Sequence, residues 1–288
     1  GLFFLVVVFV FFFVPDLGLS FFAIMHVVCA FFGLILSYLL AKDIIPTFAS
    51  IDWKLVSKLF KFGKYILGTG LTSAVGKNAD QIILGSVNHA FVALYNAGVR
   101  VLNFIEIPTL SISNIVYPKA AQAASDSGKV GVALIYHKSV ATILAIIFPI
   151  VLVTLAIPEF VLLVTAGAKY TSAAPVLRIM AAASILIPFN IQAGSAFEVV
   201  GKPQVGFYIN LAANVFNLIC NIVFIRAFGV TGAAWAFSFT IIIIFVSGQL
   251  LLRKDMKVNL IEIGKEFVGV YRTAWQWLQK RTYSKLHE

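Results

Sequence analysis

The sequence predicts an all-α integral membrane protein, and three observations support this fold class. Mean hydropathy is +0.97, and 60% of the 288 residues are hydrophobic, against about 45–50% in soluble domains. Only 12% of the residues are charged, whereas about 25% is usual. The apolar residues are grouped in runs of about 20, long enough as helices to cross the hydrocarbon core of a bilayer. We therefore expect about eight transmembrane helices.

The predicted spans follow one another with short polar turns, apart from one long interruption. The chain opens with an apolar run that is slightly short for a span and has no basic segment before it. It is therefore not a signal peptide, and we expect a fragment whose upstream helices are missing. The predicted spans are residues 2–14, 19–41, 65–85, 91–117, 139–157, 172–193, 205–227 and 233–252.

Two segments outside the spans are amphipathic. Residues 42–64 mix five lysines with aromatic and aliphatic residues, which predicts a helix on the membrane surface and a linker between two helix bundles. Residues 253–288 carry an apolar stripe at helical spacing among Lys and Arg, which predicts a second helix in the interface. The predicted divisions are thus 1–41, 42–64, 65–252 and 253–288.

The distribution of basic residues predicts the orientation in the membrane. The net charge is +10, but most Lys and Arg residues lie in the 42–64 linker, the 118–138 connection and the 253–288 tail. The opposite side has only Lys169 and Arg226. The positive-inside rule places the linker and the tail in the cytoplasm. The positive charge is therefore a signal of topology, and no nucleic-acid partner is predicted.

The 65–85 span has an unusual polar face. Thr69, Ser73, Lys77 and Asp80 are spaced by four, four and three residues, so they share one side of the helix. A charge near the bilayer midplane costs a few kcal/mol, so such residues face a cavity or a partner. One interpretation is a site for ligand or ion; the other is a Lys77–Asp80 pair that neutralises itself and joins helices.

Two further spans carry polar stripes. In the 91–117 span, Arg100 shares a face with three asparagines, and Glu106 lies at its edge. In the 205–227 span four asparagines recur at helical spacing, and they either bridge helices or line a cavity. Arg178 lies near the extracytoplasmic end of its span. The asparagines are Asn96, Asn103 and Asn114 in the first stripe and Asn210, Asn214, Asn217 and Asn221 in the second.

Residues for metal binding or enzymatic chemistry are sparse. Cys29 and Cys220 lie in apolar runs outside any metal-binding or disulfide motif, and the four histidines form no spaced ligand set. We therefore predict no metal and no cofactor. An enzyme acting at an interface loop needs a clustered acid and base. The extracytoplasmic loops offer no such pair; their residues of this kind are Asp16, His89, Glu159, Lys169 and Arg226.

Four stretches of the chain resemble a known family. They read LFKFGKYILGTGLTSAVGKNADQIILG, VALYNAGVRVLNFIEIP, NIVYPKAA and GKPQVGFYINLAANVFNLICNIVFIRAFGVTGAAWAFS. In this order they resemble the polysaccharide biosynthesis and export proteins. These are oligosaccharidyl-lipid flippases, O-antigen-type proteins included, of the multidrug/oligosaccharidyl-lipid/polysaccharide exporter superfamily. The resemblance covers about residues 58–252 well.

The resemblance implies two six-helix lobes around a central cavity, with transport by alternating access. Residues 1–41 then match the last two helices of the N-lobe, 42–64 the cytoplasmic linker and 65–252 the complete C-lobe. The implied substrate is an undecaprenyl-diphosphate-linked oligosaccharide. The implied location is the cytoplasmic (inner) membrane of a bacterium or archaeon, with membrane lipids and a polysaccharide polymerase as further partners.

This substrate assigns roles to the polar stripes. Lys77 and Arg100 are suited to phosphate oxygens, with Arg100 able to donate two parallel hydrogen bonds. The amides of Asn103, Asn210, Asn214 and Asn217 suit sugar hydroxyls. Asp80 and Glu106 either hold the cations when substrate is absent or exchange H⁺ or Na⁺ for coupling. Arg178 either assists substrate release or extends its side chain to the interface.

Three other functions remain open. A multidrug exporter and a flippase for lipid-linked peptidoglycan precursors belong to the same superfamily. An exporter of organic cations needs anionic cavity walls, whereas the cations in these spans match or outnumber the carboxylates. A membrane-embedded glycosyltransferase or ligase fits the composition but lacks the acid–base pair described above.

Overall fold

The described part of the chain is built from helices. A computed structural model describes residues 19–42 and 52–285 of the 288 residues. Within these ranges there are α-helices and one 3-10 helix but no β-strand, which confirms the all-α prediction. The chain divides into two units, residues 1–56 and 57–288, and each is described by itself. The predicted span 2–14 and most of the linker lie outside the described residues.

The first unit contains helix α2, Leu19–Ala41, with the bounds that the sequence predicts. Near the end of this unit Asp52 begins helix α3, Trp53–Val87, because its carboxylate accepts a hydrogen bond from the Lys54 amide at 2.9 Å. The part of the predicted surface helix from Trp53 onward and the 65–85 span therefore belong to one continuous helix. No proline interrupts the sequence between Trp53 and Val87.

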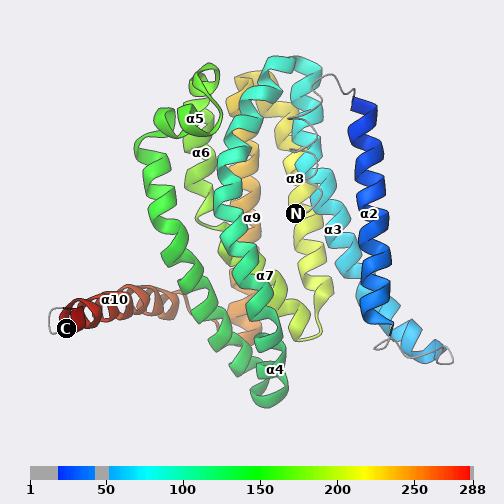
Figure 1. Ribbon diagram of the computed structural model, residues 1–288, viewed down its shortest axis with the longest axis vertical. Coiled ribbons are helices and arrows are strands. Elements are labelled where there is room, and N and C mark those ends of the chain that lie inside the picture. The colour runs from blue at the N-terminus through cyan, green and yellow to red at the C-terminus, as the bar shows by residue number, and fades with distance from the viewer. Residues whose placement is uncertain (1–18, 43–51, 286–288) are drawn as a thin grey trace. The chain divides into compact units, whose positions relative to one another are not determined.

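Helix α4, His89–Ala156, consists of two arms that reverse direction at Gly128 (Figure 1). Gly128 has φ 60° and ψ −144°, a conformation that only glycine adopts at low cost. The predicted 118–138 connection is thus helical on both sides of a turn that is confined to Gly128. Pro108 and Pro149, which are candidate bending points, lie where the backbone keeps helical dihedral angles.

The predicted 172–193 span is broken. After helix α5, Pro158–Thr165, the chain forms the 3-10 helix η1, Ala168–Ala173, and helix α6, Ala174–Ser184. Helix α7, Ile187–Val199, meets the 168–184 stretch at an angle of 40°. Pro188 lies in the first turn of α7, where it has no amide hydrogen to continue the preceding helix.

The last three helices complete the second unit. Helix α8, Pro203–Phe228, and helix α9, Val230–Met256, are joined by Gly229 alone. Helix α10, Leu260–Lys285, packs its first half on the second arm of α4 and then extends away from the bundle (Figure 1). Tyr271 Oη donates a 2.7 Å hydrogen bond to the Ala145 carbonyl in this contact.

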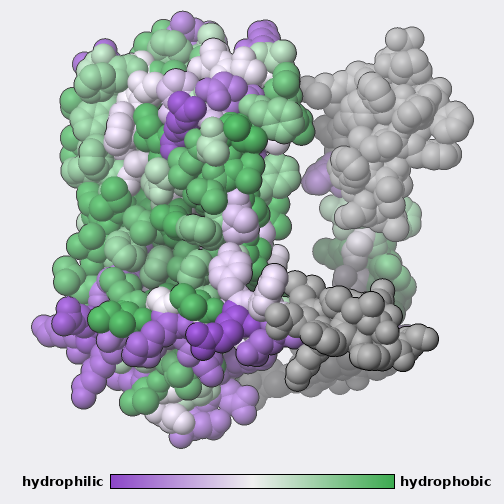
Figure 2. Space-filling view, turned by 90° about the vertical axis from the view of Figure 1, so that its left-hand side faces the viewer, coloured by the Kyte–Doolittle hydropathy of each residue, from purple (hydrophilic) through white to green (hydrophobic). Residues whose placement is uncertain are grey.

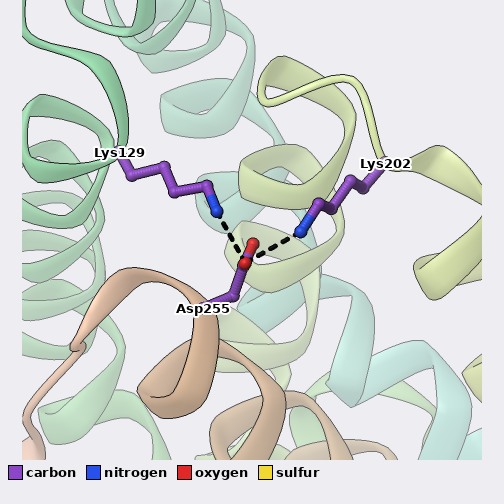
Figure 3. A network of polar contacts seen from close by, with 3 residues as sticks. All are labelled: Lys129, Lys202 and Asp255. Atoms are coloured by element: carbon purple, nitrogen blue, oxygen red, sulfur yellow. Dashed lines mark hydrogen bonds and ion pairs between the residues drawn. The ribbon is translucent and has the colours of Figure 1, made fainter.

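A three-residue ion-pair cluster joins three segments where α9 ends (Figure 3). The Asp255 carboxylate of α9 accepts from Lys129 Nζ at 2.7 Å and from Lys202 Nζ at 2.8 Å. Lys129 follows the Gly128 turn of α4, and Lys202 precedes α8. The cluster therefore fixes the α4 turn and the α7–α8 turn to the end of α9.

The bundle has the surface of a membrane protein. Of the described helices, four are long and apolar enough to cross a membrane by length and composition, or five if the bent 168–199 pair is one span. This count treats the two arms of α4 as one helix. Figure 2 shows a broad hydrophobic surface above a hydrophilic band at the level of α10. The expected total of eight spans stays a prediction.

The core of the second unit joins both arms of α4 to the surrounding helices. Ile105 and Ile143, one from each arm, are fully buried with Leu84 of α3, Met180 of α6 and Ile225 of α8. This cluster holds the first arm of α4 in place, and the polar face of that arm is left to line a cavity.

Candidate functional site

The second unit contains a cavity of about 680 Å³ among its helices. Helices α3, α4, α7 and α9 contribute most of its wall, α6 adds Met180 and α8 adds Asn210. Its wall combines apolar residues with amides, hydroxyls and carboxylates. The polar lining residues are Thr69, Lys77, Asn78, Asp80, Gln81, Tyr95, Asn103, Glu106, Ser113, Asn114, Tyr117, Asn190, Ser195, Glu198 and Asn210.

Lys77 forms an ion pair across this cavity. Its Nζ donates to Glu106 Oε1 at 2.8 Å, which connects α3 to the first arm of α4. The Lys77 side chain is 70% exposed and that of Glu106 is 28% exposed. An exposed pair of this kind contributes little stability, typically about 0–1 kcal/mol. An incoming anion can therefore replace Glu106 at Lys77 at low cost.

Asp80 lies one turn from Lys77 but has other partners. Its side chain is buried, and its two oxygens accept 2.6 Å hydrogen bonds from Tyr95 Oη and from Asn221 Nδ2. These donors belong to α4 and α8, so Asp80 joins three helices. The proposed self-neutralising Lys77–Asp80 pair is not among the ion pairs of the described residues, and Lys77 pairs with Glu106 instead.

The asparagines of α8 were expected either to bridge helices or to line a cavity, and the structure shows both. Asn210 lines the cavity, whereas Asn217 is buried and its Oδ1 accepts from Asn221 at 2.9 Å. Asn214 packs directly on Gly76 of α3, because a Cβ atom at Gly76 would overlap the Asn214 side chain. The C-terminal part of the stripe therefore bridges α8 to α3, and Asn210 at its N-terminal end faces the cavity.

The two arginines that were predicted as site residues, Arg100 and Arg178, do not line this cavity. Arg100 is exposed and is not among the described residues that line the cavity, although Asn103 on the next turn is. Arg178 lies 3.6 Å from Glu159, measured from Nη2 to Oε1, and both side chains are more than half exposed. Lys77, Asp80, Asn103, Glu106 and Asn210 are thus brought together, and the arginines are not part of that group.

One wall of the cavity was not predicted. Helix α7 lines it with Asn190, Gly194, Ser195 and Glu198. The predicted span ends at residue 193, so Glu198 falls in the predicted turn that follows. The spacing of the lining residues, four, one and three positions, is a helical face and was the available signal. Asn190 donates to the Ile241 carbonyl at 3.1 Å, and its buried Oδ1 has no partner among the described residues.

The chemistry of the wall is that of a binding site. Amides and hydroxyls offer both donors and acceptors. The charged groups among the described residues of the wall are one cation, Lys77, and three carboxylates, Asp80, Glu106 and Glu198, so the expected match or excess of cations over carboxylates does not hold at this cavity. Among the described residues, no three His, Cys, Asp or Glu side chains lie close enough together to hold a metal ion.

Comparisons with known proteins agree with this architecture. The crystal structure of MATE in the straight conformation superposes with a TM-score of 0.64 at 14% sequence identity, covering 82% of this chain and 55% of that one. At this identity the likeness shows the fold. The chain is thus a multi-pass membrane protein with the helical fold of that transporter.

The sequence comparison identifies the family. Residues 2–175 match the family described as polysaccharide biosynthesis protein, and the chain belongs to that family. An uncharacterized membrane protein of Methanocaldococcus jannaschii is 24% identical over 80% of this chain and 48% of its own length. A probable low-salt glycan biosynthesis flippase, Agl15 of Haloferax volcanii, is 22% identical over 74% of this chain and 46% of its own length. The chain spans about half the length of these relatives.

Proposed function

We propose that this chain is part of a transporter that moves a lipid-linked oligosaccharide from the cytoplasmic to the outer leaflet by alternating access. The observation that carries the proposal is the cavity, whose described wall residues combine many amides and hydroxyls with one ammonium, Lys77, and three carboxylates, Asp80, Glu106 and Glu198. The family and the relative named as a glycan biosynthesis flippase favour the same substrate class. An undecaprenyl diphosphate carrier is the lipid that we propose.

The Lys77–Glu106 pair provides a binding step. In the absence of substrate, Glu106 neutralises Lys77 inside the cavity. A substrate phosphate competes for the ammonium with a charge-assisted hydrogen bond. Asn103 and Asn210 then bind sugar hydroxyls with amides that both donate and accept. Glu106 is released when phosphate binds, so the carboxylate and the substrate occupy Lys77 in turn.

We assign ion coupling to Asp80. It is a buried carboxylate on the cavity wall, and it forms no ion pair with another described residue. Binding of H⁺ or Na⁺ at Asp80 changes its hydrogen bonds to Tyr95 and Asn221. Because these bonds join three helices, the ion changes how α3, α4 and α8 are held together.

A flipping assay tests the substrate-binding role of Lys77. The protein, in its complete reading frame, is reconstituted in liposomes with a fluorescent lipid-linked oligosaccharide, and a membrane-impermeant quencher reports the accessible leaflet. We expect Lys77→Gln to slow flipping about tenfold, the loss of roughly one charge-assisted hydrogen bond.

Lys169→Gln is the matched control, because Lys169 is exposed and is not among the described residues of the cavity wall. An unchanged rate in Lys77→Gln would contradict the binding role. Flipping of an organic cation in place of the glycolipid would favour a multidrug exporter.

A further inference from the structure

The first arm of α4 separates two surfaces of different chemistry. On one side it lines the polar cavity with Asn103 and Glu106. On the other side it borders an apolar groove of about 510 Å³ that lies between the two arms of α4 and helix α5. The residues lining this groove are Val101, Phe104, Pro149, Ile150, Val153, Thr154, Val161 and Thr165.

The groove has no free polar group to offer a ligand. Thr154 and Thr165 are the polar side chains among the described residues that line it. Their hydroxyls donate 2.7 Å hydrogen bonds to the Ile150 and Val161 carbonyls of their own helices. The remaining lining is hydrocarbon, so the groove suits an apolar chain.

Arg100 lies between the groove and the cavity on the same helix. At about 100° per residue, Arg100 is about 60° from Asn103 and about 40° from Phe104 around the helix axis. Its side chain is exposed, and no hydrogen bond or ion pair of it is found among the described residues. Around the axis of α4, Arg100 therefore lies between the residues that line the polar cavity and those that line the apolar groove.

The depth of Arg100 bears on its ligand. It follows the start of α4 at His89 by 11 residues, about 16 Å along the axis at 1.5 Å per residue. In the predicted 91–117 span, this position is near the middle of a hydrocarbon core of about 30 Å. A charge at that depth requires a partner, and a guanidinium binds phosphate with two parallel hydrogen bonds.

We propose that Arg100 and the apolar groove bind the lipid-side phosphate and the isoprenoid chain of a lipid-linked diphosphate substrate, while its sugar-side phosphate and its sugars occupy the cavity. This inference rests on the proposed function and adds a site for the lipid. A polyprenyl phosphate presents sugar, phosphate and hydrocarbon in the order found around α4. A resting bilayer phospholipid keeps its phosphate at the interface, so a phosphate at Arg100 belongs to a lipid in transit.

A photocrosslinking experiment tests the site. The full-length protein is placed in phosphatidylcholine nanodiscs with a sugar-free polyprenyl phosphate that carries a diazirine in its chain, and labelled peptides are identified by mass spectrometry. We expect labelling of the segments that contain Phe104 and Val153. Arg100→Gln and Val153→Trp should each lower it about tenfold, and Arg100→Lys should lower it less.

Matched controls exist for both variants. Arg226→Gln removes another exposed arginine, on α8, and Val215→Trp enlarges a valine of α8 that is 52% exposed, compared with 50% for Val153. Both control variants should be labelled to the same extent as the unaltered protein. Unchanged labelling in Arg100→Gln, or equal labelling of the groove by a diazirine phosphatidylcholine, would overturn the proposal.

The outcome is separate from that of the proposed function. The probe carries one phosphate and no sugar, so it lacks the sugar-side phosphate and the sugar that are assigned to Lys77 and Asn103. If Lys77→Gln flips normally while Arg100→Gln loses labelling, the lipid site stands and the substrate-binding role of the cavity fails. If the flipping assay behaves as expected but labelling is unchanged, the groove proposal fails alone.

Discussion

At the scale of single residues, Lys77 and Asp80 differ in how strongly they are held. Lys77 is mostly exposed and has one carboxylate partner. Asp80 is buried and accepts from two donors on two other helices. The first arrangement suits exchange with a ligand. The second suits a group whose protonation or metal-ion binding is felt by several helices.

The coupling role of Asp80 predicts the behaviour of Asp80→Asn. We expect flipping that no longer responds to an imposed H⁺ or Na⁺ gradient, because an amide neither takes up a proton nor carries the charge that attracts Na⁺. The measurement is the flipping rate with and without a gradient of each ion. Tyr95→Phe removes one hydrogen bond but keeps the carboxylate, so it should retain the response. A gradient response that survives in Asp80→Asn would assign coupling to another residue.

At the scale of elements, the α4 hairpin positions both proposed sites. Its first arm carries Asn103, Glu106 and Arg100, and its second arm supplies Pro149 and Val153 to the groove. The two arms are joined without an intervening loop, since the reversal occurs at Gly128. The conformation of this one residue therefore determines where the helix reverses.

The hairpin predicts a large effect of Gly128→Ala. A side chain at φ 60° costs about 1–3 kcal/mol, although no atom lies within 4 Å of the added Cβ. We expect a lower midpoint of denaturation in detergent. Gly264→Ala is the control, because its Cβ also meets no atom within 4 Å but the residue is helical. That change should be neutral or stabilise by up to about 1 kcal/mol. Equal midpoints for the two variants would argue against a strained turn.

At the scale of the whole chain, function depends on orientation in the membrane. The Gly128 turn, the Asp255 cluster and the start of α10 lie at one end of the second unit, and η1 lies at the other (Figure 1). The charge distribution predicts that the Gly128 end is cytoplasmic.

Cysteine labelling in whole cells tests this orientation. Ser127 and Ser172 are exposed; Ser127 directly precedes the Gly128 turn of α4, and Ser172 lies in η1 between α5 and α6. The reversal of α4 and helix α5 lie at opposite ends of the second unit (Figure 1), and Ser→Cys is nearly isosteric. A membrane-impermeant maleimide should label Ser172→Cys in intact cells and Ser127→Cys only after the membrane is permeabilised. The parent protein reports the background of Cys29 and Cys220. The reverse pattern would invert the predicted topology.

Several features followed from the sequence because they depend on local properties. Helix formation, the bounds of α2 and the polar faces of α3, α4 and α8 can be read from apolar run length and spacing. Local signals also mislead: the Ala-rich 118–138 segment reads as a connection because it is polar, yet its residues form helix on both sides of Gly128. The sequence showed Pro188 and the polar residues that follow it. It did not show that the break at Pro188 directs the polar face of α7 toward the cavity.

The sequence by itself determined that this protein is a helical membrane protein and which residues bring polar groups into the spans. Only the tertiary structure decided that Lys77 pairs with Glu106, that Asp80 meets Asn221, and that Arg100 lies between cavity and groove. The physical reason is that composition and periodicity fix which side of a helix is polar. The rotation and packing of each helix against its neighbours fix which polar side chains meet.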